Sequence, residues 1–117
     1  MLPIKNRLIK KGDFEKVFRE GRGVSSGPVF LKFRKNGLEE VRLGIVVGIK
    51  FSPRAVERNG VKRQMREFFR RELERIRGGF DIVIGPVKRG GVEIQKRQNW
   101  DKWLERALEK GKLTIKQ

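Results

Sequence analysis

Basic side chains recur at every fourth position along one segment in the middle of the chain. The ridge and its immediate neighbours comprise Arg58, Asn59, Lys62, Arg63, Arg66 and Arg70. On a helix, residues four apart lie on one flank, and like charges at this spacing disfavour the helix by about 0.2–0.5 kcal/mol per pair. A flank selected only for solubility would mix Glu with Lys and Arg. The spacing therefore indicates phosphate binding in preference to a solvated charged face.

The composition also indicates a polyanionic partner. The 117 residues include 30 Lys and Arg against 14 Asp and Glu, which gives a formal net charge of +16. A length of this size fits one domain, residues 1–117. With 0 His and 0 Cys, the chain has no means of forming disulfides, Cys or His metal sites, Ser-His-Asp triads or Cys nucleophiles.

No apolar run approaches the roughly 18 residues of a membrane span. The N-terminal residues "MLPIKNRLIKKGDF" lack the apolar segment of a secretory signal. We therefore expect no membrane partner and a cytoplasmic location.

Helices and short strands must position the ridge. A helix is expected over 14–20, with Asp13 as its N-cap and Gly21 at its end. The long ridge-bearing helix is expected to start at Ser52 and Pro53 and to end at Gly78 and Gly79. A third helix, 99–110, carries an apolar stripe, in which Trp100 and Trp103 are core anchors more readily than a platform for bases. The other predicted segments are a flexible loop at 21–27, strands at 28–35, 41–50 and 80–86, and a loop at 87–98.

The order helix, two or three strands, helix, strand, helix predicts a single-domain α+β sandwich. In the second strand, the face that contains Gly44 and Gly48 allows close approach of either a packed helix or a ligand. From sequence alone the packed helix is favoured.

Several segments together carry a resemblance to the bacterial ribonuclease P protein subunit. "RNGVKRQMREFFR" resembles the family's Arg-Asn-rich helix, and "RLIKKGDFEKVFREG" resembles its opening segment. "RLGIVV" and "GFDIVI" match its strands in content and order, so the likeness covers approximately 6–110.

The resemblance implies an αβββαβα fold whose mostly antiparallel sheet is packed by helices, with a left-handed crossover between parallel strands. It implies two RNA partners, the catalytic RNA of ribonuclease P and the 5′ leader of precursor tRNA, and no required protein partner. In this family the RNA performs metal-dependent removal of the leader. No catalytic or metal-binding residue is therefore expected in the protein, and Mg²⁺ would enter through the RNA.

Carried over by position, two sets of residues are implied. Contacts with the catalytic RNA would come from Lys50, Arg58, Asn59, Lys62, Arg63 and Arg66, and Arg70 is added to them because it continues the ridge. The leader cleft would be lined by Phe14, Phe18, Phe30, Lys32 and Arg34. Aromatic side chains beside cations suit single-stranded RNA, because each stacked base contributes about 1–3 kcal/mol. For Phe14, a place in the core is equally consistent with the sequence.

The chain departs from the family pattern at Gly60, where a third basic residue is usual. The basic cluster after the second strand is also thinned, to Gly48, Ile49 and Lys50. Two other functions compete with the resemblance: a general RNA-binding or ribosome-associated protein, and a self-sufficient metal-dependent nuclease. A two-metal nuclease needs clustered carboxylates, and the sequence offers the isolated candidates Asp13, Asp81 and Asp101.

Overall fold

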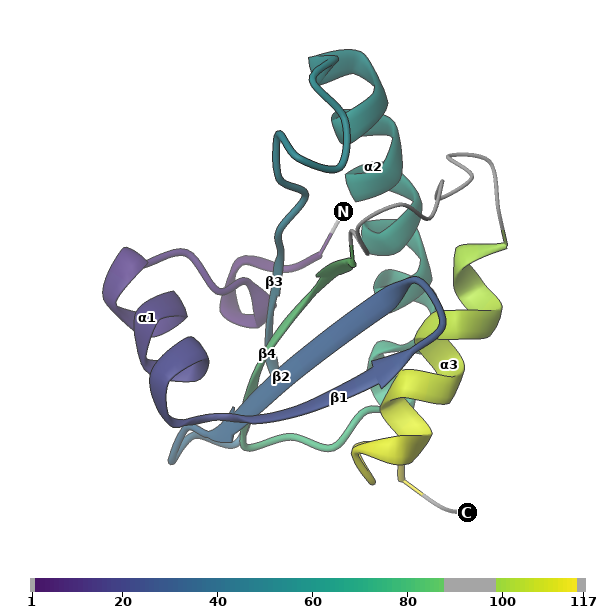
Figure 1. The fold of residues 1–117 in the computed structure, drawn as a ribbon. Helices are drawn as coiled ribbons and strands as arrows, with labels where there is room; N and C mark the ends of the chain where they lie inside the picture. The colour runs from purple at the N-terminus through teal and green to yellow at the C-terminus, as the bar shows by residue number, and fades with distance from the viewer. Residues whose placement is uncertain (1, 88–98, 116–117) are drawn as a thin grey trace.

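A four-stranded sheet lies between one helix on one face and two helices on the other (Figure 1). The computed structural model describes residues 2–87 and 99–115. Its strands are β1 (Arg22–Ser26), β2 (Val29–Lys35), β3 (Arg42–Ile45) and β4 (Phe80–Pro86). Its helices are α1 (Lys11–Glu20), α2 (Ala55–Glu72) and α3 (Trp100–Lys110), with 3-10 turns at Ile4–Asn6 and Leu73–Arg75. The α+β class and the order αβββαβα are confirmed.

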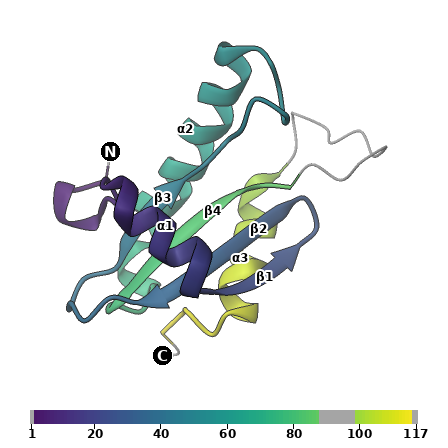
Figure 2. The ribbon, with the colours of Figure 1, turned by 60° about the vertical axis from the view of Figure 1, so that its left-hand side comes forward.

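The strands lie in the order β1-β2-β4-β3, so the last strand in sequence lies inside the sheet (Figure 2). β2 pairs antiparallel with both β1 and β4, whereas β3 pairs parallel with β4. The sheet is therefore mostly antiparallel, and α2 lies within the connection between its two parallel strands. The left-handed sense of that crossover stays a prediction from the family resemblance.

The larger core lies between the sheet and the pair α2 and α3. The buried residues of α2 are Val61, Met65, Phe68 and Phe69, which form the stripe that the sequence predicted. Trp100 is 1% exposed, which confirms it as an anchor, and Trp103 is partly buried against the same cluster. A smaller core of Leu8, Val17 and Val83 lies under α1 on the opposite face.

The predicted loop at 21–27 is wrong, because Arg22–Ser26 forms the edge strand β1. Val24 faces Leu31 across the pair, and Ser26 faces Val29 at the two-residue turn of the hairpin. Gly27 in this turn has φ +54°, a left-handed conformation that suits glycine. The local sequence "RGVSS" lacks strand character, and pairing with β2 supplies it instead.

The predicted second strand, 41–50, is too long. β3 ends at Ile45, one further hydrogen bond joins the Val46 N–H to the Ile84 carbonyl, and a turn then closes from Phe51 to Gly48. Val47 is still buried although it lies beyond β3, so the apolar alternation of the sequence extends further than the strand itself.

The bounds predicted for the ridge-bearing helix are also wrong at both ends. α2 begins at Ala55. The buried Ser52 hydroxyl accepts from the Arg54 N–H in the preceding turn and donates to Glu57 in the first turn of α2. The chain leaves helical geometry after Arg75, where Ile76 forms a bridge with Thr114. Ile76, predicted on the helix stripe, is thus buried beyond the helix.

At α1 the N-cap is Lys10, not Asp13, which lies inside the first turn. Gly21 and Gly111 are the C-caps of α1 and α3, as predicted. β4 matches the predicted strand at both ends. Of the predicted loop at 87–98, residues 88–98 lie outside the described residues.

Candidate nucleic-acid interface

A groove of about 300 Å³ brings α1, β3 and α2 together. Its lining includes Phe14 from α1, Gly44 from β3, and Lys62 and Arg66 from α2. Arg7, just after the first 3-10 turn, adds a third cation that sequence reasoning did not select. The groove therefore combines one aromatic ring with positive charge from two separate parts of the chain, which is the combination that single-stranded nucleic acid requires.

Phe14 lies directly on the backbone of Gly44. A Cβ at position 44 would be 2.5 Å from the nearest ring atom, closer than packed atoms tolerate. The packed-helix explanation for this glycine face is thus confirmed at Gly44, whereas a Cβ at Gly48 would meet only the Lys50 backbone, at 4.0 Å. Phe14 is half-buried, so it is at once a packing residue and part of the groove wall.

Phe18, Phe30 and Lys32 form a second cluster beside α1. The ring centroids of Phe18 and Phe30 are 6.4 Å apart, and Phe18 is 41% exposed. The Lys32 ammonium lies 5.7 Å from the centre of the Phe18 ring and donates to the Phe18 carbonyl at 3.1 Å. This cluster presents an exposed ring with a cation already in place beside it.

Arg34 shares the strand face of Phe30 and Lys32 but is engaged elsewhere. Its Nε donates to the Glu20 carboxylate at 2.8 Å. The next position across the sheet is Asp81, which faces Arg34 in the β2–β4 pair. The basic strand face therefore has two parts. Lys32 lies beside the exposed Phe18 ring, whereas Arg34 is already engaged in an ion pair with Glu20.

Asp81 is held by a network that joins three parts of the chain. It is 1% exposed, and Arg42 donates to its two oxygens at 2.7 and 2.6 Å. Asn36 donates to the same carboxylate, and Asp13 lies 3.4 Å from the Arg42 guanidinium. The hydrogen bond with Asp81, with the charges of Asp81 and Asp13, raises the pKa of Arg42 against the opposing effect of burial.

The nuclease candidates are thus all engaged by arginines. Asp13 and Asp81 share Arg42, and Asp101 binds Arg71 at 2.6 Å. Within residues 2–87 and 99–115, no group of three or more His, Cys, Asp or Glu could hold a metal ion.

The basic ridge of α2 divides into groups with different surroundings. Lys62 and Arg66 line the groove, and neither makes an ion pair with another described residue. Arg63 lines a separate depression of about 420 Å³ between α2 and the start of α3. Asn59 and Lys50 are exposed, the latter in the turn before α2. The groove therefore receives two of the predicted contact residues.

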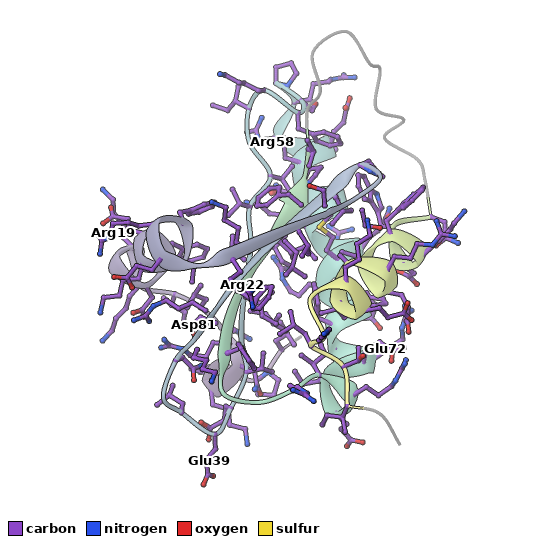
Figure 3. All side chains as sticks on the ribbon, turned by 60° about the horizontal axis from the view of Figure 1, so that its bottom comes forward. Arg19, Arg22, Glu39, Arg58, Glu72 and Asp81 are labelled. Carbon is purple, nitrogen blue, oxygen red and sulfur yellow. The ribbon has the colours of Figure 1, made fainter. Side chains whose placement is uncertain are left out.

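The two ends of the ridge are restrained by other groups. Arg58 is half-buried near the start of α2 (Figure 3). Its guanidinium donates to the Ser52 carbonyl at 2.8 Å. Arg70 donates to Glu67 at 3.0 Å, and this hydrogen bond lowers the pKa of Glu67 and raises that of Arg70. The free cations of the ridge are consequently in its middle.

Gly60, where the family pattern carries a basic residue, has open space around it. A Cβ built there meets no heavy atom within 4 Å. The departure from the pattern is therefore not imposed by packing.

In the part of the chain that the structure describes, no helix is long and apolar enough to span a membrane.

Taken together, these features define a small, strongly basic α+β protein with a cationic groove beside aromatic rings. The family model for ribonuclease P matches residues 2–111. The chain belongs to the ribonuclease P protein family.

Relatives and solved structures agree with that assignment. The ribonuclease P protein component of Thermotoga maritima is 43% identical over 96 residues, which cover 82% of this chain and 81% of that protein. The corresponding protein of Nitrosococcus oceani is 36% identical over 100 residues, covering 86% and 82%. The structure of the Thermotoga maritima RNase P protein superimposes with a TM-score of 0.77 at 38% identity, covering 95% of this chain and 98% of that one. That of Staphylococcus aureus gives 0.80 at 26%, covering 94% and 98%.

Proposed function

We propose that this protein binds the catalytic RNA of ribonuclease P through α2 and holds the 5′ leader of precursor tRNA beside α1. The observation that carries the proposal is the shared groove, in which Lys62 and Arg66 of α2 lie with Phe14 of α1. A strand of RNA that leaves the α2 surface would meet the Phe14 wall within the same groove.

The leader is proposed to continue to the second cluster. Phe18 offers an exposed ring for stacking, and Lys32 places a cation within reach of a neighbouring phosphate. Arg34 is assigned a different part, because its pairing with Glu20 must break before it can bind a phosphate. Its role in this proposal is to hold the end of α1 against β2.

The protein is proposed to act without a catalytic residue of its own, with Mg²⁺ bound by the RNA partner and no second protein needed. The sequence has neither His nor Cys to serve as base or nucleophile. The protein's contribution would be to screen phosphate repulsion and to position the leader. A cytoplasmic location belongs to the same proposal, since precursor tRNA is made there.

Reconstitution tests the proposal. The protein is combined with a bacterial ribonuclease P RNA and precursor tRNA at limiting Mg²⁺, with protein-alone and RNA-alone controls. We expect cleavage at the mature 5′ end to be stimulated only in the mixture. Cleavage by the protein alone would instead support the nuclease alternative, and binding of RNA without stimulation would support a general RNA-binding protein.

A comparison of precursor tRNA with mature tRNA separates binding of the leader from binding of the tRNA body. In the reconstituted complex, the protein should tighten binding of precursor tRNA and leave the affinity for mature tRNA unchanged. Phe18→Leu should reduce this difference, because it removes an exposed ring and keeps an apolar side chain. Equal tightening of both substrates would contradict the leader assignment.

A further inference from the structure

A second cationic ridge runs along α3, separate from the ridge of α2. Lys102, Arg106 and Lys110 are exposed and recur at every fourth position, so they lie on one flank of the helix. Successive members are about 6 Å apart along the helix axis. None of the three makes an ion pair with another residue that the structure describes.

The charges of α3 are segregated between its two flanks. The acidic flank faces α2, where Asp101 binds Arg71 at 2.6 Å and Glu105 binds Arg75 at 3.1 Å. The cationic flank faces the β1 edge of the sheet, where the Lys110 ammonium donates to the Ser25 carbonyl at 2.7 Å. Packing against α2 accounts for the acidic flank. On the cationic flank Lys110 contacts Ser25, whereas among the described residues no contact with α2 or the sheet explains the charges of Lys102 and Arg106.

Trp103 holds two of these cations in place. Its ring lies against the backbone of Gly27 in the β1–β2 turn, where a Cβ would be 2.6 Å from the ring. The Lys102 ammonium and the Arg106 guanidinium carbon each lie 5.1 Å from the ring centre. Such contacts are weak at exposed sites, so they favour, without fixing, conformations in which both charges lie beside the Trp103 ring.

We propose that the flank formed by Lys102, Arg106 and Lys110 is a second phosphate-binding surface, for the backbone of RNA. This inference rests on the proposed function, because it assigns a further contact to the same RNA partners. The α2–α3 contact separates this flank from the groove of Lys62 and Arg66, so one RNA would have to pass around the molecule, or a different RNA segment would dock here. The catalytic RNA and the precursor tRNA are the two sources of such a backbone.

The test compares two triple variants with the same change of charge. Lys102→Gln/Arg106→Gln/Lys110→Gln removes the flank, and Lys16→Gln/Lys35→Gln/Arg77→Gln removes three exposed cations elsewhere. Binding of catalytic RNA alone, and of precursor tRNA to the reconstituted complex, is measured between 50 and 200 mM salt. With three phosphate contacts, the wild-type affinity should fall about 20- to 40-fold more than that of the α3 variant over this range.

The two binding measurements identify which RNA contacts the α3 flank, and they distinguish failure of this inference from failure of the proposed function. A loss with catalytic RNA alone assigns the flank to that RNA, and a loss confined to the precursor arm assigns it to the substrate. Equal behaviour of the two triple variants in both arms overturns the inference. A Lys62→Gln/Arg66→Gln variant reports on the proposed function separately: if wild type binds neither RNA, that function fails first. Thermal unfolding by circular dichroism checks that each variant is folded.

Discussion

The ring of Phe14 occupies the space that a side chain at Gly44 would need, with a Cβ there only 2.5 Å from the ring. Gly44→Ala must therefore move Phe14 or the α1 backbone, and overpacking of this kind costs about 1–3 kcal/mol. We expect lower stability in urea unfolding and weaker discrimination between precursor and mature tRNA. Gly12→Ala is the matched control, because no heavy atom lies within 4 Å of its Cβ. Wild-type stability in Gly44→Ala would show that Phe14 moves freely and does not form a fixed wall.

Gly60 can be replaced without a clash, so its substitution separates helix stability from charge. Gly60→Ala and Gly60→Gln should each raise the free energy of unfolding, by up to about 1 kcal/mol, because glycine is a poor helix former. Gly60→Arg should do the same and also steepen the salt dependence of RNA binding by about 0.7–0.9 in log–log slope. A slope equal to that of Gly60→Gln would mean that no phosphate lies near this turn of α2.

Arg66 and Arg58 share the spacing of the ridge but differ in their contacts, so their alanine variants should differ. Arg66→Ala should lower the salt slope of RNA binding by about 0.7–0.9 and leave stability unchanged. Arg58→Ala also removes the hydrogen bond to the Ser52 carbonyl. It should therefore lower the free energy of unfolding by about 1 kcal/mol in addition. An unchanged salt slope in both variants would count against the ridge as a contact surface.

Arg42→Met removes the guanidinium that donates two hydrogen bonds to the buried Asp81. Removal of one member of a buried pair costs about 3–5 kcal/mol, because the other charge stays uncompensated. Arg71→Met is the control, since its pair with Asp101 is exposed on both sides and such pairs contribute about 1 kcal/mol or less. Similar urea midpoints for the two variants would show that water reaches Asp81.

Burial explains which elements could be predicted from the sequence. β4 was predicted with the right ends because most of its residues are buried and its apolar run has clear limits. β1 was missed because its strand character comes from β2, a partner that local composition does not reveal. Ser52 looked like a helix cap, yet it lies three residues before Ala55, and its buried hydroxyl accepts from the Arg54 N–H in the turn that precedes α2.

The candidate site was predictable in its residue types but not in its grouping. Spacing of four placed Lys62 and Arg66 on one flank, and one residue further along the helix, Arg63 turns towards a different depression. Arg42 and Asp81 are 39 residues apart in sequence, so no local pattern joins them. The pairing of Arg34 with Glu20 likewise depends on how α1 crosses β2.

The place of β4 between β2 and β3 sets an order of assembly during synthesis. While the ribosome has made only the first 79 residues, β3 lacks the one strand with which it pairs, and β2 has only β1. The β1–β2 hairpin is a local structure and can close early, whereas the parallel pair must wait for α2 and β4 to follow. Translation past Pro86 therefore supplies an inner strand last, and the nascent protein gains two of its three strand pairs, β2–β4 and β3–β4, in a single late event.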